Sequence, residues 1–586
     1  MSLGQQTFGG GIVSRLLGSW IWGLEHAFER TRASGRPEDD TRLRIFVILT
    51  LFGCAFLAVA VGATRAALFS GHVAVPVGAA PVGASRADLV DRNGQMLAAD
   101  LLHYGLYIDP REIWDTEETR AALTRSLPKL DKARLERALR GPRRTFLVGA
   151  LTPAERGVIH ALGLPGVTFE PEERRVYPLG STGAHIIGFA DSGGEGLSGA
   201  ELALNEEIRA GAQARKEIPL SIDLRVQAAL EDEVYKAAAE FTPKGAVGIV
   251  MNVHSGEILG MASYPTFDPN NPGAATEEAK LNRAAGAVYE MGSTFKAFTV
   301  AVGLDAGVAT PTSTFDARFP YKLGYRTISD YHAARKVLTL VEVFQHSSNI
   351  GTAKLAVAIG PERLSRYFGA LGLTSTAKIE LAESARPLTP KVWNEDAVAS
   401  TSFGHGMNVS AITLSRAMAT LLNGGTLPTL TIRKQAAGYV SQGPRAVSAQ
   451  TSQQMLDIMR ANVTGGSGGK ADVPGLFVGG KTGTGEKYDP AIRGYNHSRQ
   501  VSSFAAVFPT DGALTDPRYF VLVLMDEPKG TASTFGFSTG GWVAAPAAGR
   551  TIARIAPFLG VARKADVSTL VATAPAAPGE EPGEDQ

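Results

Sequence analysis

Cysteine is almost absent from this chain: there is one in 586 residues, Cys54, which excludes an internal disulfide framework. An excess of either charge is missing too, because 58 Lys and Arg face 57 Asp and Glu. This balance gives no reason to expect nucleic acid as a partner. The 10 histidines show no metal-ligand spacing, and we expect His405 to pack in a turn. No metal or cofactor is therefore predicted.

Charge is absent from one long apolar stretch, which runs from Ile45 to Ala63. About 20 such residues span a bilayer core as a helix. Arginines precede it closely, at positions 30, 32, 36, 42 and 44, whereas only Arg65 follows before Arg86. We therefore predict one transmembrane helix at 45–64 in the inner (cytoplasmic) membrane, with residues 1–44 in the cytoplasm and the rest outside.

Composition divides the remainder of the chain. From Val13 to Phe28 apolar residues recur at helical spacing, which predicts an amphipathic helix lying either in the membrane interface or against a partner. Residues 65–216 combine a linker rich in Ala, Val, Gly and Pro with enough chain for one domain. Residues 217–562 form a second, larger domain, and 563–586 read as a disordered tail.

The larger domain is predicted to be α+β. Strand-like runs at 246–252 and 258–263 flank a turn, as do runs at 503–508 and 519–525. Helical segments interrupt these runs rather than alternate with them. This order favours an antiparallel sheet flanked by helices.

Three short motifs follow one another in this domain. Ser293 and Lys296 are three residues apart, so a helix would place them on one face. Ser347-Ser348-Asn349 and Lys481-Thr482-Gly483-Thr484 come downstream. A serine hydroxyl is a weak nucleophile until a base takes its proton. The ordered trio therefore indicates a serine acyltransferase of the Ser-Lys type, which needs no metal.

These motifs, with landmarks from about Arg86 to about Val561, resemble the class B penicillin-binding proteins. The landmarks include Asp91-Arg92-Asn93-Gly94, Arg175-Val176-Tyr177-Pro178 and Ser402-Phe403-Gly404-His405-Gly406. The resemblance implies a D,D-transpeptidase that cross-links peptidoglycan stem peptides through an acyl-enzyme on D-Ala-D-Ala, releases D-Ala and is a target of β-lactams. It also implies a non-catalytic, dimerisation-type pedestal within 65–216 and a transpeptidase domain at 217–562.

The motifs then take catalytic roles. Ser293 is expected to be the nucleophile and Lys296 its general base, which requires a lowered lysine pKa. Ser347 is expected to bridge Lys296 and Lys481 and to shuttle a proton towards the leaving group. Asn349 is expected to hold Lys296 and to bind a peptide amide of the substrate.

The third motif is expected to bind the substrate. Lys481 and Thr482 suit the terminal carboxylate of D-Ala-D-Ala. Gly483 would let the donor peptide approach and join an edge strand. By resemblance, the backbone N–H groups of Ser293 and Thr484 form the oxyanion hole.

Some positions depart from the family pattern or have no assigned role. Met291 stands where the family usually has Pro, Asn252 where it has Asp, and Gly485 where it has Ala. Each departure concerns local geometry, not reaction type. Ser348 is interpreted as a spacer.

The same triad also serves β-lactamases and β-lactam receptors. We find no Glu that would activate a deacylating water, and about 44 residues before the span leave little room for a signalling domain. Within class B, the run 327–331 followed by Ser347-Ser348-Asn349 resembles the septal division type more than the elongation type. That type implies a SEDS-family glycan polymerase and other divisome membrane proteins as partners.

Overall fold

The computed structural model describes residues 86–214, 216–489 and 494–564, with only the backbone at 488–489 and 497–498, and scattered residues from 26 to 60. The chain divides into two units, 1–79 and 80–586. In the first, Ile45 and residues 47–53, 55–57 and 59–60 are helical. The other residues of the predicted span, most of the predicted helix at 13–28, and the tail after 564 lie outside the described residues. No described helix is long and apolar enough to cross a membrane.

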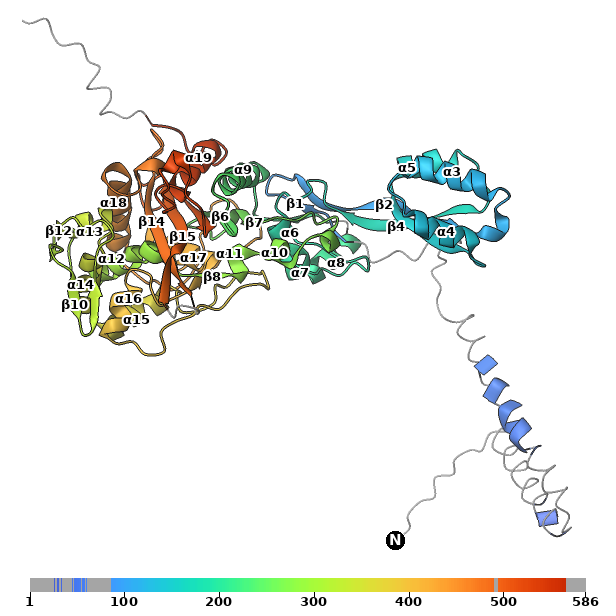
Figure 1. The fold of residues 1–586 in the computed structure, drawn as a ribbon. Helices are drawn as coiled ribbons and strands as arrows, with labels where there is room; N and C mark the ends of the chain where they lie inside the picture. The colour runs from blue at the N-terminus through green and yellow to red at the C-terminus, as the bar shows by residue number, and fades with distance from the viewer. Residues whose placement is uncertain are drawn as a thin grey trace, which may run out of the picture. The chain divides into compact units, whose positions relative to one another are not determined.

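The second unit begins with a five-stranded sheet (Figure 1). Its strands are β1 (Leu89–Val90), β2 (Met96–Ile108), β3 (Thr145–Leu151), β4 (Val167–Val176) and β5 (Ile218–Pro219). The long strand β2 pairs antiparallel with β1, β3 and β4, whereas β1 pairs parallel with β5. One end of β2 therefore pairs with β1, the first strand of this unit, and the other end pairs with β3.

Residues 109–166, which we call the head, lie at the far end of β2. Three helices form it: α3 (Thr116–Ser126), α4 (Lys132–Arg140) and α5 (Pro153–His160). Each begins at a side-chain cap that satisfies free backbone N–H groups: Asp115, Asp131 and Thr152, respectively. Their apolar faces, with the ends of β2 and β3, form a small core of their own.

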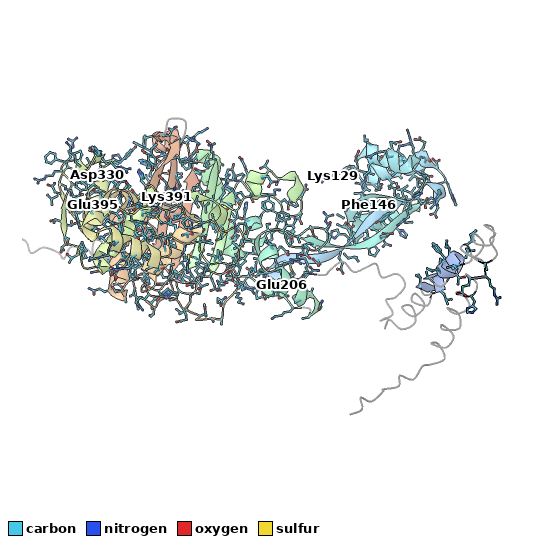
Figure 2. The ribbon with its side chains drawn as sticks, turned by 90° about the horizontal axis from the view of Figure 1, so that it is seen from below. Lys129, Phe146, Glu206, Asp330, Lys391 and Glu395 are labelled. Atoms are coloured by element: carbon cyan, nitrogen blue, oxygen red, sulfur yellow. The ribbon has the colours of Figure 1, made fainter. Side chains whose placement is uncertain are left out.

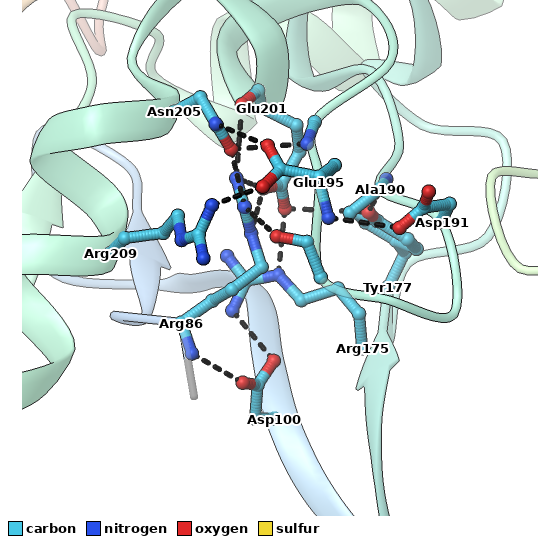
Figure 3. Close-up of polar contacts among 12 residues, drawn as sticks. Arg86, Asp100, Arg175, Tyr177, Ala190, Asp191, Glu195, Glu201, Asn205 and Arg209 are labelled. Atoms are coloured by element: carbon cyan, nitrogen blue, oxygen red, sulfur yellow. Dashed lines mark hydrogen bonds and ion pairs between the residues drawn. The ribbon is translucent and has the colours of Figure 1, made fainter. Parts of the chain in front are cut away.

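A buried polar network fixes the start of this unit (Figure 3). Glu201 is fully buried and accepts hydrogen bonds from Arg86 Nη2 at 2.6 Å and from Arg175 Nε at 2.7 Å. Asp100 accepts from the Arg86 backbone N at 2.6 Å and from Arg175 Nη1 at 3.1 Å. The network thus ties Arg86, where the described part of this unit begins, to β2, β4 and α7 (Gly199–Ala203). Removing one partner would leave a buried charge uncompensated, which costs about 3–5 kcal/mol.

The C-terminal part is built on a five-stranded, wholly antiparallel sheet in the order β14-β15-β16-β6-β7. The strands are β14 (Gly479–Asp489), β15 (Gly494–Phe508), β16 (Tyr519–Asp526), β6 (Gly245–Asn252) and β7 (Ile258–Tyr264). Both predicted hairpins are present, and the expected antiparallel sheet is confirmed. Strand β14 lies at the edge of the sheet, with one side of its backbone unpaired by any strand of the described chain.

Helices cover both faces of this sheet (Figure 1). On one face α9 (Leu224–Phe241) and α19 (Ala544–Ile555) pack together against β6, β7, β15 and β16. On the other lie α17 (Ala411–Leu422) and α18 (Ala449–Gly465). Helix α12 (Lys296–Asp305) packs among α14, α17 and α18, and its residues 296–303 are all buried. A helix that is apolar all round is expected at the centre of a domain.

The remaining elements are short. The other helices are α6 (Ala184–Ile187), α8 (Asn205–Gln213), α10 (Glu277–Lys280), α11 (Arg283–Gly286), α13 (Leu340–Gln345), α14 (Asn349–Ile359), α15 (Pro361–Ala370) and α16 (Glu395–Thr401). Short strand pairs join β8 (Val288–Tyr289) to β13 (Val409–Ser410), β9 (Thr314–Asp316) to β12 (Val337–Thr339), and β10 (Tyr321–Leu323) to β11 (Arg326–Ile328). The 3-10 turns are η1 (Pro110–Glu112), η2 (Pro272–Ala274), η3 (Gly292–Phe295), η4 (Gly469–Ala471) and η5 (Ala532–Thr534).

Candidate active site

Ser293 lies on η3, the 3-10 turn that leads into α12, and it is half-buried. The turn is pressed against β14. Gly292 has a φ of 55°, and a Cβ built there would lie 2.3 Å from the carbonyl oxygen of Thr484. Only glycine tolerates both the left-handed backbone and this close approach. The sequence prediction of a shared helical face is modified in detail, because Ser293 belongs to the turn and Lys296 begins the helix.

The side chain of Lys296 is completely buried and points to the second motif. Its Nζ donates to Asn349 Oδ1 at 2.7 Å, to Ser347 Oγ at 3.1 Å and to the carbonyl oxygen of Ser347. Burial lowers the pKa of Lys296 to about 7, against a smaller, opposite effect of the Asp330 carboxylate. A lysine with this pKa is partly neutral at physiological pH and able to accept a proton.

Lys481 reaches the same place from β14. Its Nζ donates to Ser347 Oγ at 2.9 Å, to the Thr482 carbonyl at 3.2 Å and to Thr482 Oγ1 at 3.3 Å. The side chain is fully buried, and burial followed by the nearby charge of Lys296 holds its pKa well below the usual lysine value. The structure thus brings residues from three motifs around one hydroxyl, that of Ser347.

The loop that presents Ser347 is held by residues that the motif analysis did not assign. Ser348 Oγ donates to Asp330 Oδ2 at 2.7 Å and accepts from the Gly351 backbone as the N-cap of α14. Asp330 Oδ1 also accepts from the Ile350 N–H at 2.9 Å. Ser348 is therefore more than the spacer that the sequence suggested. It anchors the turn, in which Ser347 has a strained φ of 54°.

The third motif lies on the edge strand β14. Thr482 Oγ1 lies 2.8 Å from Ser467 Oγ, which adds a second hydroxyl beside Lys481. Ser467 was missed because it stands outside every motif. Thr484 Oγ1 accepts from the Gly540 backbone at 3.2 Å. These contacts fix the side chains on which the predicted substrate-binding roles rest.

The structure gives Gly483 a packing role that the sequence analysis did not foresee. A Cβ at this position would lie 2.3 Å from Ser503 Oγ, 2.6 Å from the Met291 carbonyl and 2.8 Å from Thr294 Cγ2. The protein itself fills that space, so Gly483 is required by the packing of β14 against η3. The predicted approach of substrate to this residue stays a prediction.

Two of the positions that depart from the family pattern, Gly485 and Met291, lie close to each other where the loop 290–292 meets β14. A Cβ at Gly485 would lie 2.2 Å from the carbonyl oxygen of Glu290, next to Met291 in the chain. Met291 is itself fully buried. The loop 290–292 therefore runs closer to β14 than an alanine at 485 would permit.

A pocket of about 790 Å³ adjoins the site at Asn349. It lies between the segment around β11, helix α16 and the end of β14, and its lining is mostly polar or charged. His405 belongs to it and stacks on Tyr495 with ring centroids 5.1 Å apart. The charged residues of the lining are Arg326, Asp396 and Glu486. Among the residues that the structure describes, no group of three or more His, Cys, Asp or Glu is placed to hold a metal ion.

Comparison with known proteins agrees with this geometry. The family described as "Penicillin binding protein transpeptidase domain" matches residues 246–552, and "Penicillin-binding Protein dimerisation domain" matches residues 81–210. The chain is 65% identical over 570 residues to "Probable peptidoglycan D,D-transpeptidase FtsI" of Caulobacter vibrioides, covering 96% of this chain and 97% of that protein. It is 32% identical to "Probable peptidoglycan D,D-transpeptidase PenA" of Neisseria gonorrhoeae, covering 76% and 80% of the two chains.

A more distant relative and a solved structure extend the comparison. The chain is 29% identical to "Peptidoglycan D,D-transpeptidase FtsI" of Escherichia coli K12, covering 89% and 93% of the two chains. The crystal structure of penicillin binding protein 3 from Mycobacterium tuberculosis with aztreonam superposes with a TM-score of 0.63 at 23% identity, covering 82% of this chain and 98% of that one, which shows the shared fold. The chain therefore belongs to the penicillin-binding protein transpeptidase family, with a dimerisation domain ahead of the transpeptidase domain.

Proposed function

We propose that this chain is a peptidoglycan D,D-transpeptidase that cross-links stem peptides and is acylated by β-lactams. The observation that carries the proposal is the convergence of Lys296 and Lys481 on Ser347 Oγ, in the turn-to-helix setting that also holds Ser293. The names of the relatives that are 65% and 32% identical support the same reaction.

The first half of the reaction forms the acyl-enzyme. Ser293 Oγ attacks the carbonyl carbon of the penultimate D-Ala, and its proton passes to the neutral amine of Lys296, whose pKa is about 7. The backbone N–H groups of Ser293 and Thr484 stabilise the oxyanion, a contribution of about 3 kcal/mol for each donor in acyl-transfer enzymes. Collapse of the intermediate breaks the peptide bond, and the departing D-Ala amine receives a proton by way of Ser347.

The second half regenerates the enzyme. An amine of a neighbouring stem peptide attacks the acyl carbon and loses a proton to the same Lys296–Ser347 pair, and Ser293 leaves with its hydroxyl restored. Lys481, Thr482 and Ser467 hold the terminal carboxylate of the donor. Asn349 keeps Lys296 in place through its Oδ1.

The edge position of β14 sets the direction of the donor. With its carboxylate beside Lys481, a peptide that pairs with the free edge of β14 runs toward Glu486, about 17 Å along the strand. The residue before D-Ala-D-Ala then faces Asn349 and the mouth of the 790 Å³ pocket. This pocket is where the proposal places the stem peptide.

The proposal further assigns the enzyme to septal synthesis rather than elongation. It rests on the run 327–331, on the triplet Ser347-Ser348-Asn349 and on the two relatives named FtsI. This role implies a SEDS-family glycan polymerase and divisome membrane proteins as partners. Cross-linking assays with and without candidate polymerases test it, since a septal enzyme should gain activity only with its own polymerase.

A single-pass anchor completes the proposal, with the transpeptidase domain outside the cytoplasm. Its support is the uncharged run Ile45–Ala63, whose described large apolar side chains, apart from the partly buried Val47, are more than half exposed on a helix. A reporter that is active only outside the cytoplasm should be active after Ser85 and silent after Gly35. The opposite pattern would separate the enzyme from its substrate and reject the topology.

Mass spectrometry tests the nucleophile directly. Intact protein treated with benzylpenicillin should gain one covalent adduct, which maps to Ser293, and Ser293→Ala should gain none. An adduct that persists in Ser293→Ala would remove the assignment. Release of D-Ala with formation of a cross-linked product separates transpeptidation from hydrolysis.

The two lysines should not be interchangeable. Lys296→Arg keeps a positive charge but cannot act as a base, because guanidinium does not deprotonate in proteins, so acylation should be abolished. Lys481→Arg should retain part of the activity, since carboxylate binding needs only the charge. Equal acylation rates in both variants would contradict this division of roles.

A further inference from the structure

The head carries a dense group of exposed cations that the reaction does not use. Six of them form no ion pair with any acidic residue of the described chain, and we call them the basic face: Arg125, Lys129, Lys132, Arg134, Arg137 and Arg143. Figure 2 labels two residues of the head, Lys129 and Phe146. The guanidinium of Arg134 lies over the ring of Phe146. Within residues 125–143 such a concentration of uncompensated charge requires an explanation.

The fold itself leaves these charges unpaired. Helix α4 buries Leu135, Ala138 and Leu139 against the core of the head, which turns its cations to solvent. Two acidic residues, one at the start of α4 and one within it, are already engaged, and Glu155 has an electrostatic interaction with Lys129. Asp131 caps α4, and Glu136 pairs with Arg120 and Arg140. Like charges one turn apart on a helix are mildly destabilising, so this face favours an external anion.

The head also exposes a large aromatic side chain. Trp114 is 89% exposed and lies two residues after η1, which packs against α4. Exposure of the apolar part of a tryptophan ring to water is unfavourable. At a membrane–water interface, however, this amphipathic ring lies at the headgroup level. Basic residues together with such a ring are the combination found in segments that lie on anionic bilayers.

We propose that the basic face of the head binds the anionic phospholipid headgroups of the bilayer that holds the proposed anchor. The inference rests on the anchor of the proposed function. Residues 64–85 could extend about 70 Å and β2 spans about 43 Å, so the connection is long enough for the head to reach the bilayer. The cations are spread over two helices, α3 and α4, and the turns beside them, which suits a diffuse surface of charge rather than one acidic side chain.

Each basic residue close to an anionic leaflet strengthens association about fivefold, and the effect fades within a Debye length. Contact through several residues would therefore be strong at low salt and weak at high salt. The contact would hold the head against the bilayer and restrict how the enzyme presents its active site.

The test uses the full chain in lipid nanodiscs with a fluorescent label on the head. Cys54→Ser removes the native thiol, and Pro142→Cys places a single bimane label in the exposed turn after α4. Discs contain either phosphatidylcholine alone or equal parts of phosphatidylcholine and phosphatidylglycerol, each with a headgroup nitroxide that quenches at short range. We expect strong quenching only in the phosphatidylglycerol discs, and its loss at high salt.

Charge variants identify the surface responsible. Lys132→Glu with Arg137→Glu should reduce the quenching to the level of phosphatidylcholine discs. Arg363→Glu with Arg366→Glu makes the same change on α15, whose two arginines are exposed and form no ion pair in the described chain, and should leave the quenching unchanged. A label at Tyr325, which is fully exposed in the transpeptidase domain, should not be quenched.

Separate readouts distinguish the possible failures. Co-elution with the discs reports the anchor, and acylation by benzylpenicillin reports a folded, active domain. If both hold and the label at 142 is not quenched in phosphatidylglycerol discs, the lipid proposal is wrong and an acidic protein becomes the candidate occupant. Equal quenching with and without phosphatidylglycerol would also overturn it, because charge would then play no part.

Discussion

Lys296 and Lys481 donate to the same oxygen, Ser347 Oγ, at 3.1 and 2.9 Å. Both amines are fully buried, and the charge of Lys296 lowers the pKa of Lys481. Two protonated ammonium groups on one hydroxyl would be strongly unfavourable without water. The geometry therefore favours a neutral amine at one of the two positions, which the proton-shuttle role proposed for Ser347 requires.

Acylation should depend on pH through Lys296. The folded-state pKa of about 7 lies below the usual lysine value, so the amine becomes a competent base as pH rises through about 7. The rate of acylation by benzylpenicillin should increase about tenfold per pH unit below this pKa and level off above it. Stopped-flow or quench measurements over the neutral range check this. A rate that stays flat from pH 5 to about 9 would exclude Lys296 as the titrating base.

Removing Asp330 should shift that profile to lower pH. The carboxylate of Asp330 raises the pKa of Lys296, opposing burial, so Asp330→Asn should move the acid limb below pH 7. Ser348→Ala is the matched control, because it breaks the Ser348–Asp330 hydrogen bond and keeps the charge. It should leave the limb in place and cost about 1 kcal/mol of stability through loss of the α14 cap. Identical limbs in wild type and Asp330→Asn would contradict the electrostatic account.

Gly485→Ala should impair acylation out of proportion to stability. The new methyl group would meet the Glu290 carbonyl at 2.2 Å and push the loop that carries Ser293 away from β14. Misplacement of a nucleophile by about 1 Å costs about 100-fold in rate. Adding Met291→Pro restores the pair that the family usually has and should recover part of the loss. A Gly485→Ala enzyme with the wild-type rate would show that this contact does not position Ser293.

Gly157→Ala serves as the control for the substitution itself. Gly157 lies in α5, and a Cβ there meets no atom within 4 Å. Alanine should raise stability by up to about 1 kcal/mol because it forms helix better than glycine. Acylation of this variant should be unchanged.

The sequence located the residues that meet at the candidate site better than the groups that hold them. Ser293, Lys296, Ser347, Asn349 and Lys481 stand in motifs whose spacing carries chemical meaning. The structure then brings the last four into direct hydrogen bonds. The two hairpins could be predicted because strand-like runs and turn residues are local signals.

The roles of Asp330 and Ser467 and the packing requirement at Gly483 could not be predicted, because each depends on contacts between distant segments. Asp330 acts on a loop 18 residues away, and Ser467 meets Thr482 only when α18 packs beside β14. Gly483 is required by atoms of Met291, Thr294 and Ser503. Such requirements arise from tertiary packing, which no local pattern encodes.

Two buried glutamates on α9 should affect stability in opposite directions. Burial raises the pKa of Glu231 to about 7, although the Gly183 N–H and the Gln227 amide donate to it. The folded state then binds more protons than the unfolded state between about pH 4.5 and 7, so stability falls as pH rises across this window, by about 3 kcal/mol at most. Glu231→Gln should remove this loss and raise the unfolding midpoint at pH 8.

Glu233, two residues along the same helix, provides the contrast. Burial would raise its pKa, but hydrogen bonds from Arg550 and Arg554 outweigh burial and lower it. Its ionised form stabilises the fold above the unfolded-state pKa, and this stability is lost as pH falls through the folded-state pKa. Glu233→Gln should therefore lower the midpoint at pH 8, where Glu231→Gln raises it. Chemical unfolding followed at pH 5 and pH 8 separates the two, and a fall in midpoint for both variants at pH 8 would show that packing, not charge, governs Glu231.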